Sequence, residues 1–413
     1  MTAAREIPSH VLERQREASD PTLSAWVSAN AGSGKTYVLA QRVIRLLLAG
    51  TPPAKILCIT FTKAAAANMA TSVFDRLAQW TALADAELDA AIHAMTKAWP
   101  SPALRAAARR LFAQALETPG GLKVQTIHAF CTRLLQQFPF EANVPARFAV
   151  LDEAAQSQLI EALTLDVLLE AAADPAGALG RALAAVIAGT SDQVFRDVLA
   201  EAIRKRADLM AWIDHTGGIE AACRQLSFML GVGPQETAQS IEDRLFAESL
   251  IAAAEWPALR AALRQGGTSD VAQADRLARL ALASGDERAR IYVSLFCNQN
   301  GTPRIRMVTG AFADLHPGRA ARLGEEQTRV CGLINRRRAA MARERTQALV
   351  TIADRIIARF RAEKDRRGIL DYDDLIEKTA ILLDRVESAW VHYKLDLGID
   401  HVLIDEAQDT SPA

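Results

Sequence analysis

Apolar residues follow two patterns along the chain, and these patterns divide it into stretches of different character. Short apolar runs at 23–27, 55–61, 122–127 and 399–404 have the length of strands. The aliphatic run at 55–61 is typical of a strand buried on both faces of a parallel sheet. Helix-like patterns fill 38–48, 64–80 and 83–116 between the runs. Together the two patterns predict an α/β domain.

Between about residues 151 and 364 the pattern is almost entirely helical, with stripes of Ala and Leu opposite faces of Arg and Glu. Breaks at 231–234, 266–267 and 316–318 separate successive helices, and 296–307 is expected to form a loop or small hairpin. No convincing internal repeat occurs. Since a strand-like run returns at 399–404, we expect the helical stretch to be an insertion that folds as its own domain.

Composition and charge narrow the possible partners. With 413 residues, half of them hydrophobic, the chain can bury at least one large core. Its formal net charge is -1, so binding to nucleic acid would require a local basic patch. The five cysteines are far apart, contain no CxxC pair and are expected to be reduced, buried thiols. The first 14 residues lack the apolar core of a signal peptide, and no apolar stretch is long enough to span a bilayer. A soluble, cytoplasmic protein without membrane contact is expected.

A glycine-rich stretch before the segment 38–48 carries the clearest chemistry. It consists of Ala29, Asn30, Ala31, Gly32, Ser33, Gly34, Lys35 and Thr36. Between a strand and a helix, such glycines let backbone N–H groups face phosphate oxygens, and the helix adds the positive end of its dipole. Lys35 can then reach the β- and γ-phosphates, and the Thr36 hydroxyl can bind Mg²⁺. The usual pattern has Gly in place of Ala29, although a small residue still permits the turn. The alternative is a glycine-rich turn that binds nothing.

The run at 399–404 leads directly into Asp405, Glu406 and Gln408. Beside a phosphate loop, ATP hydrolysis also needs a ligand for Mg²⁺ and a group that activates water, and an acidic pair at the end of a strand can supply both. Asp405 is expected to hold Mg²⁺, and Glu406 to orient or deprotonate the attacking water. Gln408 could sense the γ-phosphate. Upstream of the loop, the amide of Gln15 could both donate to and accept from adenine. The alternative is a solvated glutamine on an N-terminal helix.

Two other strand-like runs also end in polar and aromatic residues. Phe61 and Thr62 follow one, and Thr126 and His128 follow the other. Ligands of open α/β sheets bind at the carboxyl ends of strands, where Phe61 could stack on a base and Thr62 could bind a phosphate. The alternatives are that Phe61 belongs to the core, that Thr62 only caps the next helix, and that His128 is a hydrogen-bonded structural residue.

A basic cluster lies in the helical stretch, within 328–367. It contains Arg336, Arg337, Arg338, Arg343 and Arg345. The cluster could touch a phosphate backbone, or it could be a solvated helix face balanced by nearby Glu.

Five motifs, taken in order, resemble the first half of a UvrD/Rep-type superfamily 1 DNA helicase. They are Ala-Gly-Ser-Gly-Lys-Thr at 31–36, Thr-Phe-Thr-Lys-Ala-Ala at 60–65, Thr-Ile-His-Ala-Phe at 126–130, Asp-Tyr-Asp-Asp-Leu at 371–375 and Asp-Glu-Ala-Gln-Asp-Thr at 405–410. Tyr37, the wording of the third motif and the long helical insertion are most similar to the AddA group, which contains helicase–nuclease subunits related to RecB.

The resemblance implies 3′-to-5′ translocation on single-stranded DNA in double-strand break repair, with ATP and Mg²⁺ as cofactors. It also implies DNA ends as substrates and an AddB-type partner protein. By motif, Gln15 would meet adenine, residues 29–36 would bind the nucleotide, and Lys35, Asp405, Glu406 and Gln408 would be catalytic. Thr36 and Asp405 would hold Mg²⁺. The path of the DNA would be lined by Phe61, Thr62, Thr126, His128, Tyr372 and Asp373. The implied fold is a RecA-like P-loop domain, 1A, over 1–145 and 368–413, interrupted by a helical domain, 1B, over 146–367.

The chain stops just after the Asp-Glu motif, where this family continues into a second motor domain and, in the AddA group, an exonuclease. We therefore expect a fragment that holds the ATP-binding half and is inactive alone. Two other functions stay open. One is a non-catalytic module that binds DNA or a partner and keeps the nucleotide site for folding. The other is an ATPase acting on protein, which would lack the Thr-Phe-Thr and Thr-Ile-His edges.

Overall fold

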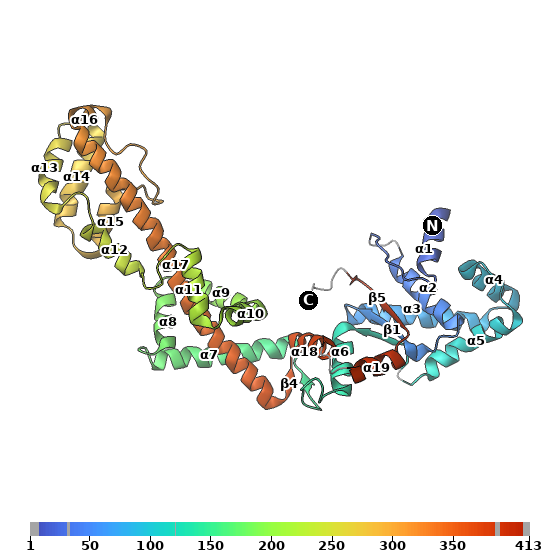
Figure 1. The fold of residues 1–413 in the computed structure, drawn as a ribbon. Coiled ribbons are helices and arrows are strands. Elements are labelled where there is room, and N and C mark those ends of the chain that lie inside the picture. Colours follow the sequence, from blue (N-terminus) through green and yellow to red (C-terminus); the bar gives the residue numbers. More distant parts are fainter. Residues whose placement is uncertain (1–7, 31–33, 120, 385–388, 408–413) are drawn as a thin grey trace. The chain divides into compact units, whose positions relative to one another are not determined.

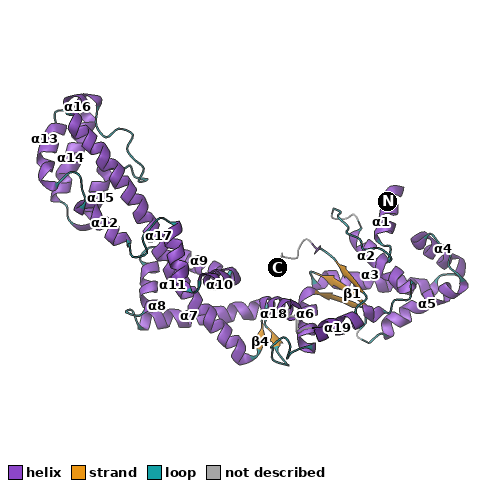
Figure 2. Cartoon of the chain, viewed as in Figure 1, coloured by secondary structure: helices purple, strands orange, loops and turns teal. Residues whose placement is uncertain are grey.

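The computed structural model describes residues 8–30, 34–119, 121–384 and 389–407. The chain divides into two compact units, residues 1–156 with 364–413 and residues 157–363 (Figure 1). Both divisions fall inside helices, α7 (Glu153–Ala173) and α17 (Pro317–Arg367). The domain boundaries expected from the sequence are after 145 and after 367. Figure 2 shows that helices make up most of the chain and that the strands lie in the first unit.

A three-stranded parallel sheet with the order β2-β1-β5 forms the centre of the first unit. Three of the expected strands are confirmed as β1 (Ile56–Thr60), β2 (Lys123–Thr126) and β5 (His401–Ile404). Thr60 lies opposite Thr126, and Ile59 lies opposite Ile404. The three strands therefore end at one edge of the sheet. A separate parallel pair joins β3 (Ala149–Val150) to β4 (Ile369–Leu370).

The strand expected over residues 23–27 is wrong. The structure gives this segment no regular secondary structure, and Trp26 within it is 83% exposed. An apolar run becomes an inner strand of a parallel sheet only when its faces are covered, and these side chains face solvent. β5 is also less buried than expected, because Val402 and Ile404 are exposed and only Leu403 is buried among its apolar residues.

Two groups of helices pack in the first unit. The first contains α2 (Lys35–Leu48), α3 (Lys63–Ala82), α4 (Asp85–Thr96) and α5 (Pro102–Glu117), which share a core with Ile56 and Cys58 of β1. The second contains α6 (Ile127–Gln137), α18 (Tyr372–Asp384) and α19 (Ala389–Gly398). Leu57 points toward this second group, since successive side chains of a strand alternate between its faces. Helix α1 (Ser9–Ala18) packs on α2.

In the second unit, helices gather around α17 in two clusters. Residues 348–356 of α17 pack with α7, α8 (Ala178–Ile187) and α9 (Asp192–Arg204). Residues 323–340 pack with a group at the other end of the helix (Figure 1). That group is α12 (Ala238–Ala247), α13 (Trp256–Leu263), α14 (Thr268–Leu282), α15 (Gly285–Phe296) and α16 (Gly310–Leu315). Two further helices are α10 (Arg206–Thr216) and α11 (Ile219–Met229).

Two of the three helix breaks expected from the sequence fall between helices, and of the third, 316–318, only His316 does. Gly231 to Pro234 separate α11 from α12, and Gly266 with Gly267 separate α13 from α14. Helix α17 begins at Pro317, earlier than the residue 328 expected from the pattern. Residues 296–307, expected to form a loop or small hairpin, contain one antiparallel bridge between Cys297 and Pro303.

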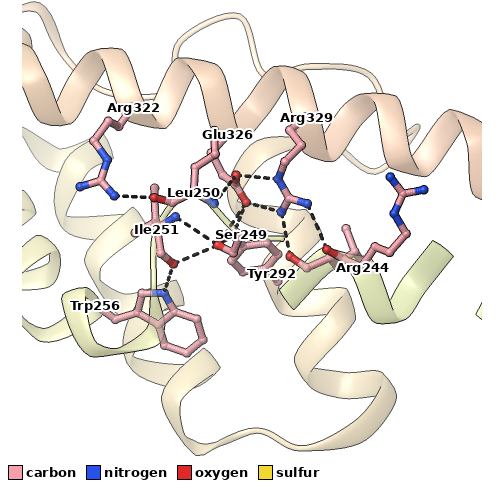
Figure 3. A network of polar contacts seen from close by, with 10 residues as sticks. Arg244, Ser249, Leu250, Ile251, Trp256, Tyr292, Arg322, Glu326 and Arg329 are labelled. Carbon is pink, nitrogen blue, oxygen red and sulfur yellow. Dashed lines mark hydrogen bonds and ion pairs between the residues drawn. The ribbon is translucent and has the colours of Figure 1, made fainter. Parts of the chain in front are cut away.

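A buried polar network ties α17 to the helices packed on it (Figure 3). The carboxylate of Glu326, fully buried, accepts hydrogen bonds from the Leu250 N–H at 3.1 Å, from Arg329 and from Tyr292. Arg329 also donates to the carbonyl oxygens of Arg244 and Leu245. Because the carboxylate accepts from three donors, its charge can lie inside an otherwise apolar cluster.

The basic cluster of α17 is largely matched by acceptors. Arg336 pairs with Glu236 at 2.6 Å, and Arg337 pairs with Glu242 at 2.8 Å. Arg343 is buried and donates to the carbonyl oxygens of Pro234 and Glu236. For these arginines the structure supports the alternative of a helix face balanced by nearby Glu, with one arginine closing a loop.

All five cysteines are free and buried, as expected. Among the described residues, the helices are too short or too polar to cross a membrane.

Candidate functional site

The glycine-rich stretch leads into α2, which begins at Lys35. Gly34 precedes the helix with φ +91°, a left-handed conformation that residues with a Cβ rarely adopt. Thr36 is exposed in the first turn, where backbone N–H groups lack partners within the helix. Ala29 and Asn30 are exposed, while Ala31, Gly32 and Ser33 lie outside the described residues. Anions bind at helix N-termini through such N–H groups, and Lys35 and Thr36 lie in this first turn.

The acidic pair lies beside this helix start. The Lys35 Nζ is 3.3 Å from the Glu406 carboxylate, although 371 positions separate the two residues in sequence. The Asp405 N–H donates to the Ile59 carbonyl oxygen at 2.9 Å, which fixes the end of β5 against β1. The sheet thus brings Lys35 and Glu406 together. Gln408 lies outside the described residues.

Asp405 and Glu406 are held in a tight turn. Glu406 has φ 52°, and its N–H donates to the Asp405 carboxylate at 3.1 Å. Burial of Asp405, followed by the charge of Glu406, raises the pKa of the Asp405 carboxyl, while Lys35 opposes the shift. Two carboxylates this close favour a cation between or beside them.

These residues fit a nucleotide and a magnesium ion. Oxygen atoms are the ligands that Mg²⁺ prefers, and the Thr36 hydroxyl and the Asp405 carboxylate supply them. The Lys35–Glu406 pair shows that the lysine can reach a negatively charged oxygen at this edge. The donor set is therefore chemically suited to a Mg²⁺-bound phosphate chain.

Gln15, on α1, lies next to the loop. A Cβ built on Gly34 would lie 3.1 Å from the Gln15 Nε2. Two arginines that the sequence analysis missed hold α1 there. Arg42 donates to the carbonyl oxygens of Ala18 and Asp20, and Arg45 donates to the Ser19 hydroxyl at 2.9 Å. The sequence did contain a signal for them, because two arginines on the buried side of one helix need hydrogen-bond acceptors nearby.

The ends of β1 and β2 carry the other candidate residues. Phe61 is 47% exposed, which contradicts the alternative that it belongs to the core. Thr62 accepts from the Ala65 N–H at 3.1 Å and caps α3, and Thr126 accepts from the Ala129 N–H at 3.2 Å and caps α6. A capping hydroxyl still has a hydrogen to donate, so capping does not exclude contact with a phosphate.

His128 lies against Tyr372, with ring centres 4.6 Å apart. Burial lowers the pKa of His128, and the nearby Asp373 raises it in part. Asp373 is exposed beside them. The buried ammonium of Lys364 holds the start of α18, since its Nζ is 3.0 Å from Asp371 and 2.5 Å from Asp374. That buried ion pair, which the sequence analysis missed, fixes the turn that carries Tyr372 and Asp373.

A parallel sheet whose carboxyl edge gathers a lysine from a glycine-rich loop and an acidic pair from another strand defines the class of phosphate-loop α/β proteins. The chain belongs to the UvrD/REP helicase family, because the family model described as "UvrD/REP helicase N-terminal domain" matches residues 12–413.

Similar curated proteins are named as a subunit of an "ATP-dependent helicase/nuclease". The chain is 30% identical over 155 residues to the protein of Lactobacillus acidophilus, a match that covers 38% of this chain and 11% of that protein. It is 30% identical over 153 residues to the protein of Lactiplantibacillus plantarum, covering 37% and 11%. With the protein of Levilactobacillus brevis it shares 33% identity over 134 residues, covering 32% and 9%. The matches thus span about a tenth of the relatives' length.

Proposed function

We propose that this chain is the ATP-binding part of a motor that moves 3′ to 5′ along single-stranded DNA and acts in double-strand break repair. The observation that carries the proposal is the contact between Lys35 and Glu406, 3.3 Å apart at the sheet edge where Phe61 and His128 also lie. Membership in the UvrD/REP helicase family supports a helicase motor. The direction of movement rests on the resemblance of the motifs.

In this proposal the sheet-bearing residues 1–145 and 368–413 are a RecA-like domain, 1A, and residues 146–367 are a helical domain, 1B. The name shared by the relatives supports a role within a helicase–nuclease of more than one chain. We propose DNA ends as the substrate and an AddB-type protein as the partner.

The nucleotide chemistry follows from the contacts of Lys35. In the structure its ammonium is bound to Glu406. A triphosphate with Mg²⁺, held by Thr36 and Asp405, would offer Lys35 more negative charge than one carboxylate does. Lys35 would then shift to the phosphates, and Glu406 would be free to accept a proton from water. Bound Mg²⁺ would neutralise charge on the β- and γ-phosphate oxygens. Gln15, held against Gly34, would bind the base, and Gln408 would sense the γ-phosphate.

The DNA path in the proposal runs along the carboxyl ends of β1 and β2. Phe61 offers an exposed ring on which a base can stack. Thr62 and Thr126 would donate to phosphates, and His128, Tyr372 and Asp373 would line the path beside them. The ring contact between His128 and Tyr372 supports a shared surface for these two.

Two titrations of the 413-residue chain test the proposal. Fluorescence anisotropy with a labelled oligothymidine measures DNA binding, and calorimetry with a Mg²⁺-bound, non-hydrolysable ATP analogue measures nucleotide binding. We expect both ligands to bind, with DNA affinity falling steeply as salt rises, and Lys35→Ala to lose nucleotide while keeping DNA. Nucleotide binding without DNA binding would favour an ATPase acting on protein. DNA binding without nucleotide binding would favour a non-catalytic module.

A further inference from the structure

A cavity of about 140 Å³ lies beside β2, α6 and α19 in the first unit. Its wall includes Lys123, the first residue of β2, and Gly398 with Ile399, which lead into β5. The cavity is therefore toward the amino ends of the strands. Lys35 and Glu406 lie at the carboxyl ends, so this is a different place from the nucleotide site.

Gln125 is the unusual residue in the cavity wall. Its side chain is 8% exposed, and among the described residues neither its amide oxygen nor its amide nitrogen has a hydrogen-bond partner. Gln125 is two positions after Lys123 on β2, so both side chains point to the same face of the sheet. A buried amide without partners is costly, and a polar ligand in the cavity would remove that cost.

Apart from Gln125 and Gln137, the polar side chains of the lining are positively charged. Lys123, Arg133 and Lys394 line the cavity, and its lining contains no Asp or Glu among the described residues. The Lys123 Nζ donates to the Gly398 carbonyl oxygen at 2.9 Å. Burial and then the charge of Arg133 lower the pKa of Lys123. In the part of the chain that the structure describes, Lys123 and Arg133 form no ion pair with a carboxylate. These cations repel one another, and an anion would relieve the repulsion.

We propose that this cavity binds a phosphate group, held by Arg133, Lys123 and Lys394 and hydrogen-bonded by the Gln125 amide nitrogen. A water molecule occupies roughly 30 Å³ in the liquid, so the cavity has room for the five non-hydrogen atoms of phosphate. A planar guanidinium is well matched to two oxygens of one phosphate. The phosphate comes from one of two sources, free inorganic phosphate or the terminal phosphate of a DNA strand.

The test is made on the 413-residue chain carrying Lys35→Ala, which removes the lysine of the nucleotide loop. Calorimetry with inorganic phosphate, at ionic strength matched with sodium chloride, measures binding to the cavity. We expect Arg133→Gln to lower phosphate affinity about tenfold to a hundredfold, since it removes a charge-assisted contact. Arg110→Gln, a charge removal at an exposed position on α5, should leave the affinity unchanged.

Gln125→Leu supplies an independent readout. It keeps the volume of the side chain and removes the unpaired amide, so we expect a higher melting temperature without phosphate and a smaller rise on adding it. A second arm compares oligothymidines with and without a 5′-phosphate. A gain in affinity from that phosphate, lost in Arg133→Gln, assigns the cavity to a DNA terminus, whereas binding of inorganic phosphate alone assigns the free ion.

Two results would overturn the inference. One is phosphate binding by the wild-type chain that disappears in Lys35→Ala, which would place the phosphate in the nucleotide loop. The other is equal phosphate affinity in Arg133→Gln, Arg110→Gln and their parent. The second result does not depend on whether the chain binds ATP or DNA, so it separates failure of this inference from failure of the proposed function.

Discussion

At Gly34, both the backbone conformation and the neighbouring Gln15 side chain disfavour a Cβ atom. Its φ of +91° disfavours any Cβ, and a Cβ would come within 3.1 Å of the Gln15 amide. Gly50, at the other end of α2, has φ +92° with open space around it. The two glycines therefore separate the cost of backbone strain from the effect on Gln15.

We predict that Gly34→Ala and Gly50→Ala each lower the free energy of unfolding by about 1–2 kcal/mol, the cost of a left-handed residue with a Cβ. Only Gly34→Ala should also weaken binding of a Mg²⁺-bound ATP analogue, by about tenfold, because it displaces Gln15. Urea denaturation and calorimetry measure the two effects. Equal nucleotide affinity in both variants would show that Gln15 does not contribute to the site.

Phe61 is the second residue whose role can be isolated. Its ring is 47% exposed and makes little contribution to the core, so removing it should leave the melting temperature nearly unchanged. If a base stacks on the ring, Phe61→Ala should weaken binding of single-stranded DNA by about 1–3 kcal/mol. Fluorescence anisotropy at fixed salt measures the change. A large fall in melting temperature with unchanged DNA affinity would restore the core interpretation.

At the scale of elements, α17 depends on a buried charge. Burial raises the pKa of Glu326, but hydrogen bonds from Arg329, Tyr292 and the Leu250 N–H outweigh burial and leave the pKa below its usual range. A carboxyl with a lowered pKa stabilises the folded state above its unfolded pKa, about 4.3. That stability is lost as the pH falls through the lower, folded value.

We predict that Glu326→Gln lowers the free energy of unfolding at pH 7 by about 3 kcal/mol, since it breaks one partner of a buried pair. The variant should also lose part of the fall in stability below about pH 4. The matched control is Glu325→Gln, the exposed neighbour on the same helix. Urea denaturation at several pH values gives both quantities. Indistinguishable curves for the two variants would mean that the network contributes nothing to stability.

The elements differ in how far the sequence could predict them. β1 and α3 follow from local pattern, because their apolar residues are mostly the ones they bury. The positions of β2, β5 and most of the long helix α17 were also predicted, but β5 buries only Leu403 and β2 buries Gln125 and Thr126. Residues 23–27 were wrongly predicted to form a strand, since an apolar run of that length is equally compatible with an exposed segment. Burial is decided by neighbours distant in sequence, which a local pattern does not contain.

For the same reason, only part of the candidate site could be predicted from the sequence. The glycine-rich loop and the Asp-Glu pair could be recognised as motifs. So could the segments with Phe61 and His128 that follow two strands. Other contacts depend on tertiary packing and could not be predicted. They are the hydrogen bonds by which Arg42 and Arg45 hold α1, the Lys364–Asp371 ion pair and the burial of the Gln125 amide without a partner among the described residues. For the arginine cluster of α17, the sequence was compatible with two roles, contact with a phosphate backbone or a helix face balanced by nearby Glu. The ion pairs with Glu236 and Glu242 favour the second role.

In the whole molecule, the sheet pairs β1, from the first part of the chain, with β5, from the last part. Lys35 and Glu406 flank an insertion of more than two hundred residues that forms its own compact unit. Register between β1 and β5 places Glu406 beside the start of α2. The same sheet supplies a natural control at its opposite end, where the Lys55 Nζ lies 3.0 Å from Asp400. Each lysine pairs with an acid beside β5, but only Lys35 does so at the carboxyl edge.

Binding of the nucleotide through Lys35 is tested by calorimetric titration of three chains, wild type, Lys35→Ala and Lys55→Ala, with a Mg²⁺-bound, non-hydrolysable ATP analogue. We predict that Lys35→Ala lowers the affinity about tenfold to a hundredfold, the value of a charge-assisted contact of about 1.5–3 kcal/mol, while Lys55→Ala matches the wild type. Superimposable titration curves for all three chains would contradict the account, because nucleotide would then bind without Lys35.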